Sequence, residues 1–185
     1  MIKKENFIFF LLFFCSLQAQ ETTWTISTSQ SYITYSGKHT LHDWEGTNEK
    51  LYGRAILNQD SKDFNKLAIL VNVRDFDSKN PGRDAHSLEV LEALQFPEIK
   101  FYADSFEHIN NTLQINGAFE FHGKKLTKSL MSAIEVEEDE ITLEGRFNII
   151  PTDFGISLPA FMLVKMKNLL EINYEIVFTK ESGSK

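Results

Sequence analysis

The chain of 185 residues contains a single cysteine, Cys15, and it lies inside an apolar N-terminal run. We expect Cys15 to be removed with that run, as argued next. The mature chain would then have no disulfide, no thiol nucleophile and no thiolate metal site. A protein exported without disulfides has to be stabilised by its own hydrophobic core.

The sequence has one long hydrophobic run, at its N-terminus. Lys3 and Lys4 precede the apolar segment Phe7–Phe14, and the small residue Ala19 follows shortly after. This order is typical of a signal peptide, and it predicts cleavage after Ala19. The run is far shorter than the roughly 20 residues that a membrane span needs. We therefore expect an exported protein, periplasmic or secreted, without stable membrane insertion.

A lipoprotein acylated on Cys15 is the alternative to simple export. That modification needs a small residue just before the cysteine, and Phe14 occupies the position. No second hydrophobic run follows, so residues 1–19 form the predicted signal peptide and residues 20–185 one soluble domain. About 166 residues are enough for a single core.

The chain also lacks an excess of positive charge. It has 19 basic and 26 acidic residues, a net charge of −7, and loss of Lys3, Lys4 and Glu5 brings this to −8. Such a charge argues against nucleic acid and anionic membranes as partners. Solubility explains it sufficiently.

Alternation of apolar and polar residues predicts that nearly everything after residue 22 is β-strand. Short polar turns at 110–111, 122–124 and 138–139 join several of these segments, so we expect antiparallel neighbours in a sandwich or closed barrel. The alternating segments cover residues 24–26, 33–39, 51–57, 67–73, 99–103, 113–121, 130–136, 141–149 and 172–178. Some of these nine segments are weakly marked, and we expect about eight strands.

Four glycines fall on the apolar faces of these strands, at Gly37, Gly53, Gly117 and Gly145. A glycine inside a strand weakens it and usually marks a barrel corner or a close approach. We take the four as favouring a barrel with spare interior volume, with ordinary bulges as the alternative.

One short helix interrupts the strands, within residues 83–96. Leu88, Leu91 and Leu94 recur at i, i+3 spacing, and Pro97 ends the helix. The fold class expected is all-β: an eight-stranded antiparallel, lipocalin-like barrel with one short helix over an opening.

The start of that helix carries several polar groups. Asp84 is expected to be its N-cap. Arg83 should pair with an acid such as Asp77, or else meet a ligand headgroup. Together with His39 and His86, Arg83 would form a polar mouth.

The order of motifs resembles that of the YceI-like family, over essentially the whole mature chain. The matching pieces are Trp24-Thr25-Ile26, Ser31-Tyr32-Ile33-Thr34-Tyr35 leading to His39, Phe76-Asp77-Ser78, Asn80 with Arg83-Asp84-Ala85-His86, Phe96-Pro97-Glu98-Ile99-Lys100-Phe101, Gly117 to Gly123, Gly145-Arg146-Phe147 and Thr152-Asp153-Phe154-Gly155-Ile156. The resemblance implies an exported barrel that binds polyisoprenoid or other long-chain lipids. The segment 39–44 departs from the family pattern and leaves the ligand's identity open.

Aromatic residues are the main functional signal. Sixteen phenylalanines are present, and eleven remain after the signal peptide. An eight-stranded barrel either fills with side chains or holds one slim ligand. A filled aromatic core is the alternative to a tunnel. Strand parity predicts an apolar tunnel lined by Ile33, Tyr35, Leu51, Phe101, Phe119, Phe121, Phe147 and Tyr174.

The break at Pro151–Met166 is too apolar for an exposed loop. It contains Phe154, Phe161 and Met162, which we add to the predicted ligand site. Loops that carry hydrophobic residues beside a cavity are often lids. We expect this segment to fold over one opening, with Phe161 and Met162 against the ligand. A plain cap on the core is the alternative.

His39 and His42 raise the possibility of a metal-dependent enzyme, with His86 or His122 as a third ligand. In an extended segment, however, residues three apart point to opposite faces. No catalytic motif is present in the sequence. We therefore expect no metal, no cofactor and no catalytic residue. The predicted function is non-catalytic sequestration or transport of an isoprenoid-like lipid, and the sequence gives no oligomeric state.

Overall fold

The computed structural model describes residues 20–38, 43–158, 160–161 and 164–181. His39, His42 and the predicted signal peptide lie outside these ranges, as does Met162. The elements are β1 (Glu21–Ile26), β2 (Tyr32–Lys38), β3 (Asp43–Asn48), β4 (Leu51–Asn58), β5 (Phe64–Asn72), η1 (Val73–Asp75), α1 (Pro81–Val90), β6 (Glu98–Ile109), β7 (Thr112–Phe121), β8 (Lys124–Val136), β9 (Glu140–Ile149), η2 (Pro151–Phe154), β10 (Ala160–Phe161), β11 (Val164–Lys165) and β12 (Leu170–Lys180).

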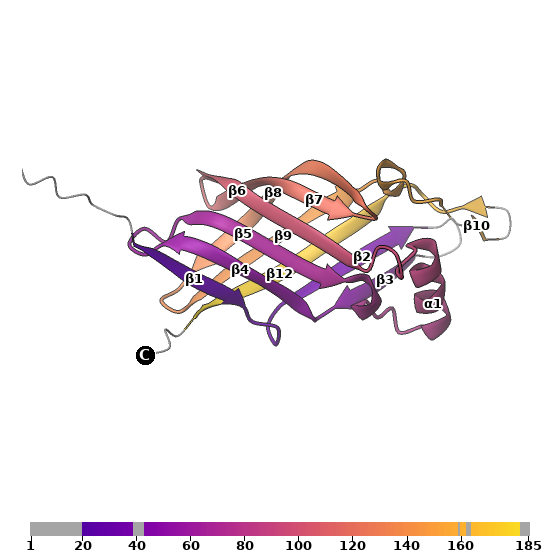
Figure 1. Cartoon of the computed structure of the whole chain (residues 1–185), viewed down its shortest axis with the longest axis horizontal. Helices are drawn as coiled ribbons and strands as arrows, with labels where there is room; N and C mark the ends of the chain where they lie inside the picture. The colour runs from indigo at the N-terminus through magenta and orange to yellow at the C-terminus, as the bar shows by residue number, and fades with distance from the viewer. Residues whose placement is uncertain (1–19, 39–42, 159, 162–163, 182–185) are drawn as a thin grey trace, which may run out of the picture.

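The long strands close into a barrel (Figure 1). β12 pairs with β9 along one edge and with both β1 and β2 along the other. On their far edges, β1 pairs with β4 and β2 with β3. Thus β1 with β2, and β3 with β4, are two interrupted strands. With β5 to β9 and β12 they give the described residues an eight-stranded antiparallel barrel, which confirms the predicted fold.

Buried polar side chains satisfy the backbone at the two interruptions. Between β1 and β2, the Ser31 hydroxyl accepts a hydrogen bond from the Val177 amide at 2.9 Å. Between β3 and β4, the Asn48 side chain accepts from the Lys50 amide at 2.7 Å and donates to the Asn72 carbonyl at 3.2 Å. Buried backbone groups need partners, and these side chains replace the missing strand contacts.

The predicted turns are confirmed, and the barrel strand β3 and the two short strands β10 and β11 were missed. His122 and Gly123, with φ of 49° and 70°, form a tight turn between β7 and β8. Asn110 likewise has a positive φ, 55°, between β6 and β7. β3 was not predicted, because the polar segment DWEGTN shows little apolar alternation. β8 begins at Lys124, earlier than expected. Its first residues are mostly exposed, so they show no apolar alternation that could have marked the start of the strand.

The glycines do mark close approaches, and the barrel does contain open volume, although the space directly over the glycines is filled. A Cβ at Gly37 would lie 2.6 Å from the Trp44 ring, and one at Gly117 would lie 2.7 Å from the Phe101 ring. The Tyr174 ring covers Gly145 in the same way. The room left by each of these glycines is occupied by an aromatic ring of a neighbouring strand.

One end of the barrel is filled. It is the end where β1 starts and β12 finishes, opposite α1 in Figure 1. The side chains that pack it are almost completely buried, with exposed fractions of at most 5 %: Trp24, Leu57, Phe64, Leu113, Ile141 and Phe178.

The helix α1 lies at the other end. It ends at Val90, earlier than predicted, and Leu94 is 98 % exposed, so Leu94 does not share the apolar face of the helix. The N-cap prediction was also wrong. Asn80 caps α1 by accepting a hydrogen bond from the Arg83 amide at 3.1 Å, and Pro81 occupies the first turn.

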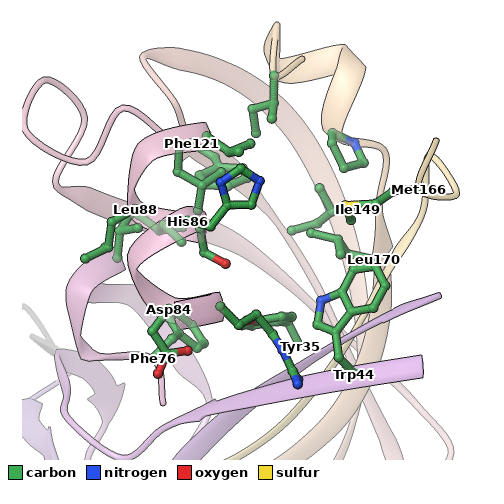
Figure 2. Close-up of a pocket in the computed structure, with 18 of the residues that line it drawn as sticks. Tyr35, Trp44, Phe76, Asp84, His86, Leu88, Phe121, Ile149, Met166 and Leu170 are labelled. Atoms are coloured by element: carbon green, nitrogen blue, oxygen red, sulfur yellow. The ribbon is translucent and has the colours of Figure 1, made fainter. Parts of the chain in front are cut away.

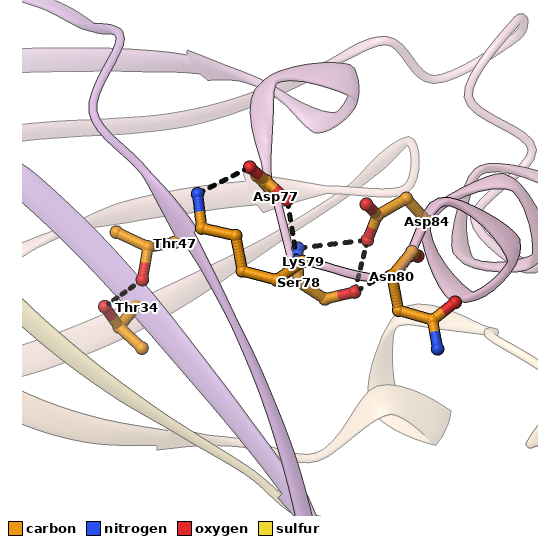
Figure 3. A network of polar contacts seen from close by, with 7 residues as sticks. All are labelled: Thr34, Thr47, Asp77, Ser78, Lys79, Asn80 and Asp84. Carbon is orange, nitrogen blue, oxygen red and sulfur yellow. Dashed lines mark hydrogen bonds and ion pairs between the residues drawn. The ribbon is translucent and has the colours of Figure 1, made fainter.

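Asp84 fixes the approach to the helix instead (Figure 3). Its carboxylate accepts hydrogen bonds from the amide and the hydroxyl of Ser78, at 3.1 and 2.5 Å. Asp77, expected to pair with Arg83, pairs with Lys79 at 2.8 Å. Arg83 is therefore not held by that acid.

Candidate functional site

A cavity of about 470 Å³ lies between α1 and the barrel wall (Figure 2). Figure 2 shows α1 on one side, Ile149, Met166 and Leu170 on the other, and Tyr35 and Trp44 near the base of the view. Most of the lining is hydrocarbon or aromatic: Tyr35, Trp44, Val73, Phe76, Leu88, Val90, Leu91, Ile99, Phe121, Ile149, Pro151, Ile156, Leu158, Met166, Leu170 and Ile172. This volume is within the range of small-ligand sites.

A second, smaller cavity of about 90 Å³ adjoins the first inside the barrel. Phe76, Ile99, Ile149 and Ile172 line both cavities. We call these four residues the junction. The small cavity therefore adjoins the large one on the side away from α1.

Polar lining residues are concentrated in one segment, Arg74 to Ser87, which leads into and along α1. They are Arg74, Asn80, Arg83, Asp84, His86 and Ser87. The remaining wall offers few polar groups, among them the Tyr35 hydroxyl. A bound amphiphile would therefore find polar partners mainly at the α1 end of the cavity.

Tyr35 and Trp44 are positioned by a reciprocal arrangement of β2 and β3. Tyr35 pairs with Gly46 in the register, and Trp44 pairs with Gly37. Each ring lies over the glycine of the other strand. Burial raises the pKa of Tyr35 and the Asp84 charge raises it further, while a hydrogen bond with Ser87 lowers it. The Tyr35 hydroxyl is thus kept neutral.

Aromatic rings surround the smaller cavity. Tyr174 and Phe147 have centroids 6.2 Å apart, and Phe147 and Phe119 are 5.8 Å apart. The Tyr174 hydroxyl reaches across Gly145 to hydrogen-bond the Ser132 hydroxyl at 2.5 Å. Ser132 is fully buried, so this pair fixes the Tyr174 ring against the wall.

Burial raises the pKa of Tyr174, and the hydrogen bond with Ser132 partly offsets the rise. The unfolded chain therefore loses the Tyr174 proton near pH 10, and the folded protein loses it at a higher pH. The stabilising contribution is complete below pH 10 and is lost above it. We expect the free energy of unfolding to fall less steeply above pH 10 in Tyr174→Phe than in the wild type. Parallel curves in chemical denaturation would contradict this assignment.

His122 joins two segments beside the large cavity. Its Nδ1 lies 3.1 Å from the Phe154 carbonyl oxygen, and its Nε2 lies 2.9 Å from the Glu92 carboxylate. The Phe96 ring packs on the imidazole with centroids 4.5 Å apart. His122 thus fastens the segment after α1 to η2.

Replacing His122 with alanine should destabilise the fold by about 1–3 kcal/mol, because partners of a nearly buried side chain lose their hydrogen bonds. The matched control is His108→Ala, which removes a surface ion pair with Asp63 at 3.4 Å and should cost less than about 1 kcal/mol. Urea denaturation measures both. Equal losses in the free energy of unfolding would show that the two hydrogen bonds of His122 stabilise the fold no more than a surface ion pair does.

The predicted tunnel residues divide into four groups. Tyr35 and Phe121 line the large cavity, as do the mouth residues Arg83 and His86. Residues that line the small cavity are Ile33, Phe101, Phe119, Phe147 and Tyr174. Leu51 and Phe154 are fully buried and line neither cavity. His39, Met162 and the Phe161 side chain lie outside the described part of the chain.

The break after β9 contributes to the wall as well as to the core. Phe154 packs against Phe119 and Phe121, with centroids 5.7 and 5.4 Å apart, so it caps the core. Ile156 and Met166, by contrast, line the large cavity. The lid hypothesis for Phe161 and Met162 stays a prediction.

Several lining residues were missed from the sequence. Ile99 and Ile172 share strand faces with Phe101 and Tyr174, so the same parity argument could have included them. Trp44 had a different signal. The motifs Tyr35-Ser36-Gly37 and Trp44-Glu45-Gly46 place an aromatic residue opposite a glycine twice in an antiparallel pair.

Within the described residues, no three His, Cys, Asp or Glu side chains are grouped to hold a metal ion. The alternative of a metal held by His39 and His42 concerns residues outside the described ranges. In the same described ranges, no helix has the length and apolar character to cross a membrane.

The protein is thus a closed antiparallel β-barrel with an apolar cavity beneath its helix. The YceI-like domain pattern matches residues 24–178, and the chain belongs to the YceI-like family. The resemblance found in the sequence is thereby confirmed. Curated protein sequences give no match to the chain.

Solved structures with this fold include three from bacteria. Burkholderia cenocepacia BcnA has a TM-score of 0.73 at 14% identity, over 82% of this chain and 98% of that one. A polyisoprenoid binding domain from Saccharophagus degradans, implicated in plant cell wall breakdown, scores 0.69 at 7% identity, over 88% and 100%. The Campylobacter jejuni YceI protein scores 0.66 at 19% identity, over 78% and 90%. At these identities the likeness shows the fold.

Proposed function

We propose that the protein binds an elongated, isoprenoid-like lipid in the cavity beneath α1 and sequesters or carries it outside the cytoplasm, without catalysis. The observation that carries the proposal is the cavity itself, about 470 Å³ and lined mostly by hydrocarbon and aromatic groups. A filled structural barrel would not leave such a space open beneath its helix.

Membership of the YceI-like family and a structural relative described as a polyisoprenoid binding domain support a lipid as the ligand. Burial of apolar surface contributes roughly 25 cal/mol per Å², so such a chain binds without a charged anchor. We propose that the ligand contacts the predicted residues that line the two cavities.

A non-catalytic role is supported by the hydrogen bonds that polar lining residues make within the protein. Asp84 accepts two hydrogen bonds from Ser78, and Asn80 caps α1. These groups hold the helix in place over the cavity. Export is supported by the sequence pattern of residues 1–19, with Lys3 and Lys4 before the apolar run.

Native mass spectrometry of protein purified from its own host tests the binding. We expect a species heavier than the mature chain by one lipid, which organic extraction releases and identifies as a long apolar chain. Protein that is purified ligand-free and takes up no long-chain lipid on incubation would overturn the proposal. Sequencing the mature N-terminus in the same sample tests export, with Gln20 as the expected first residue.

A further inference from the structure

We propose that the cavity sets a length limit: it buries one chain of about 15 to 19 carbons and gives no added affinity to a longer one. This inference rests on the proposed function and specifies its ligand class as a single-chain amphiphile with its polar group at α1.

The volumes set the size of the limit. A methylene group takes up about as much space as a water molecule, roughly 30 Å³ in the liquid. On that scale the large cavity, about 470 Å³, holds about 15 carbons. The small cavity, about 90 Å³, adds about three or four more.

The small cavity ends in a floor of tightly packed side chains. Leu67, Ile115, Leu143 and Ile176 line it and have exposed fractions of 1, 2, 1 and 3 %. Beyond this floor lies the filled end of the barrel, around Trp24. A chain that enters beneath α1 therefore cannot continue through the barrel without displacing core residues, which costs stability.

The rings of Phe119, Phe147 and Tyr174 line the small cavity between the junction and the floor. Tyr174 is held by its hydrogen bond to Ser132, so it does not swing aside at low cost. Phe147 is partly exposed, and it lines the small cavity. Phe147 pairs with Ile172 at the junction, and its removal therefore enlarges the space between the junction and the floor.

The position of the polar lining sets the direction of binding. Polar residues cluster between Arg74 and Ser87, at the α1 end. A headgroup is solvated or hydrogen-bonded there, whereas the junction and the small cavity offer almost only carbon. The length of the chain is thus measured from α1 to the floor.

The test is a series of unbranched primary alcohols with 8 to 24 carbons that displace a fluorescent fatty probe from the purified protein. Each methylene that becomes buried should raise affinity about fourfold. We expect this rise to stop between about 15 and 19 carbons, since additional carbons stay outside the floor. A fourfold rise that continues to 24 carbons would overturn the limit.

Phe147→Ala enlarges the small cavity above the floor. We expect the end of the rise to shift to longer chains by about four to six carbons, the size of the ring removed, less any collapse of the wall. Phe106→Ala is the matched control, because Phe106 packs against Phe64 in the filled half, with centroids 5.5 Å apart. It should leave the limit in place.

The outcomes distinguish a failure of the length limit from a failure of the proposed lipid binding. Should Phe147→Ala not fold, Phe147→Leu is the milder variant, and a smaller shift in the same direction is expected. An unchanged limit in a folded variant overturns the claim that the volume of the cavity sets the limit. Failure of every alcohol to bind overturns the proposed function itself, and the length limit with it.

Discussion

Ile99→Trp should abolish most lipid binding while the protein stays folded. Ile99 lies at the junction and lines both cavities, and it is only partly buried, so the larger ring can grow into open space. Displacing three or four methylenes at about 0.8 kcal/mol each weakens binding roughly 100-fold. Filling the cavity should change the free energy of unfolding by no more than about 1 kcal/mol. Probe displacement and urea denaturation measure the two effects.

The control is Tyr102→Trp, on the same strand but exposed on its outer face. It should bind as the wild type does. Undiminished lipid affinity in a folded Ile99→Trp variant would place the ligand outside the junction.

Trp24→Ala should have the opposite effect: a large loss of stability with little change in lipid affinity. Trp24 is 1 % exposed at the filled end, and Lys62 lies over its ring, with Nζ 5.0 Å from the centroid. Truncating a buried Trp costs about 3–5 kcal/mol, which corresponds to a melting temperature lower by roughly 6–20 °C. Binding measured well below that temperature should be close to that of the wild type, because the cavity is at the other end.

Trp44→Ala makes the matched comparison. Trp44 is only partly buried and lines the large cavity, so its removal should cost less stability and change lipid affinity more. If Trp24→Ala and Trp44→Ala affected stability and binding alike, the division of the barrel into a filled end and a binding end would be wrong.

Much of the fold could be predicted because the inward face of a barrel strand appears in the sequence as apolar residues at every second position. Leu113, Ile115 and Phe119 alternate with polar residues, and the structure places all three inside. β3 could not be found this way, since Asn48 and Gly46 occupy its buried positions. Their roles depend on partners distant in the sequence, the Asn72 carbonyl and the Tyr35 ring.

The site was harder to predict than the barrel, because parity tells inside from outside but not filled from open. Leu51 and Ile33 both face inward, yet Leu51 is fully buried and Ile33 lines the small cavity. What separates such residues is the packing between strands. The prediction that Leu94 belongs to the helix was wrong for another reason. The helix ends at Val90, and a repeat of three leucines does not show where a helix stops.

The glycines show how one signal supports two readings. Gly145 was correctly taken as a place of close approach. The sequence did not reveal that the Tyr174 ring fills the space above it, since the two residues become neighbours only through the pairing of β9 and β12. The open volume lies beside the rings that cover the glycines: Tyr35 and Trp44 line the large cavity, and Phe101 and Tyr174 line the small one.

Photocrosslinking tests the central claim most directly. A 16-carbon fatty chain with a diazirine at its terminal carbon is bound to the full-length mature protein and irradiated, and the adducts are mapped by mass spectrometry. The account predicts adducts on residues around the small cavity, such as Phe101, Phe119 and Phe147, and their loss in Ile99→Trp. Adducts confined to outward-facing residues such as Tyr52 and Met131 would contradict it.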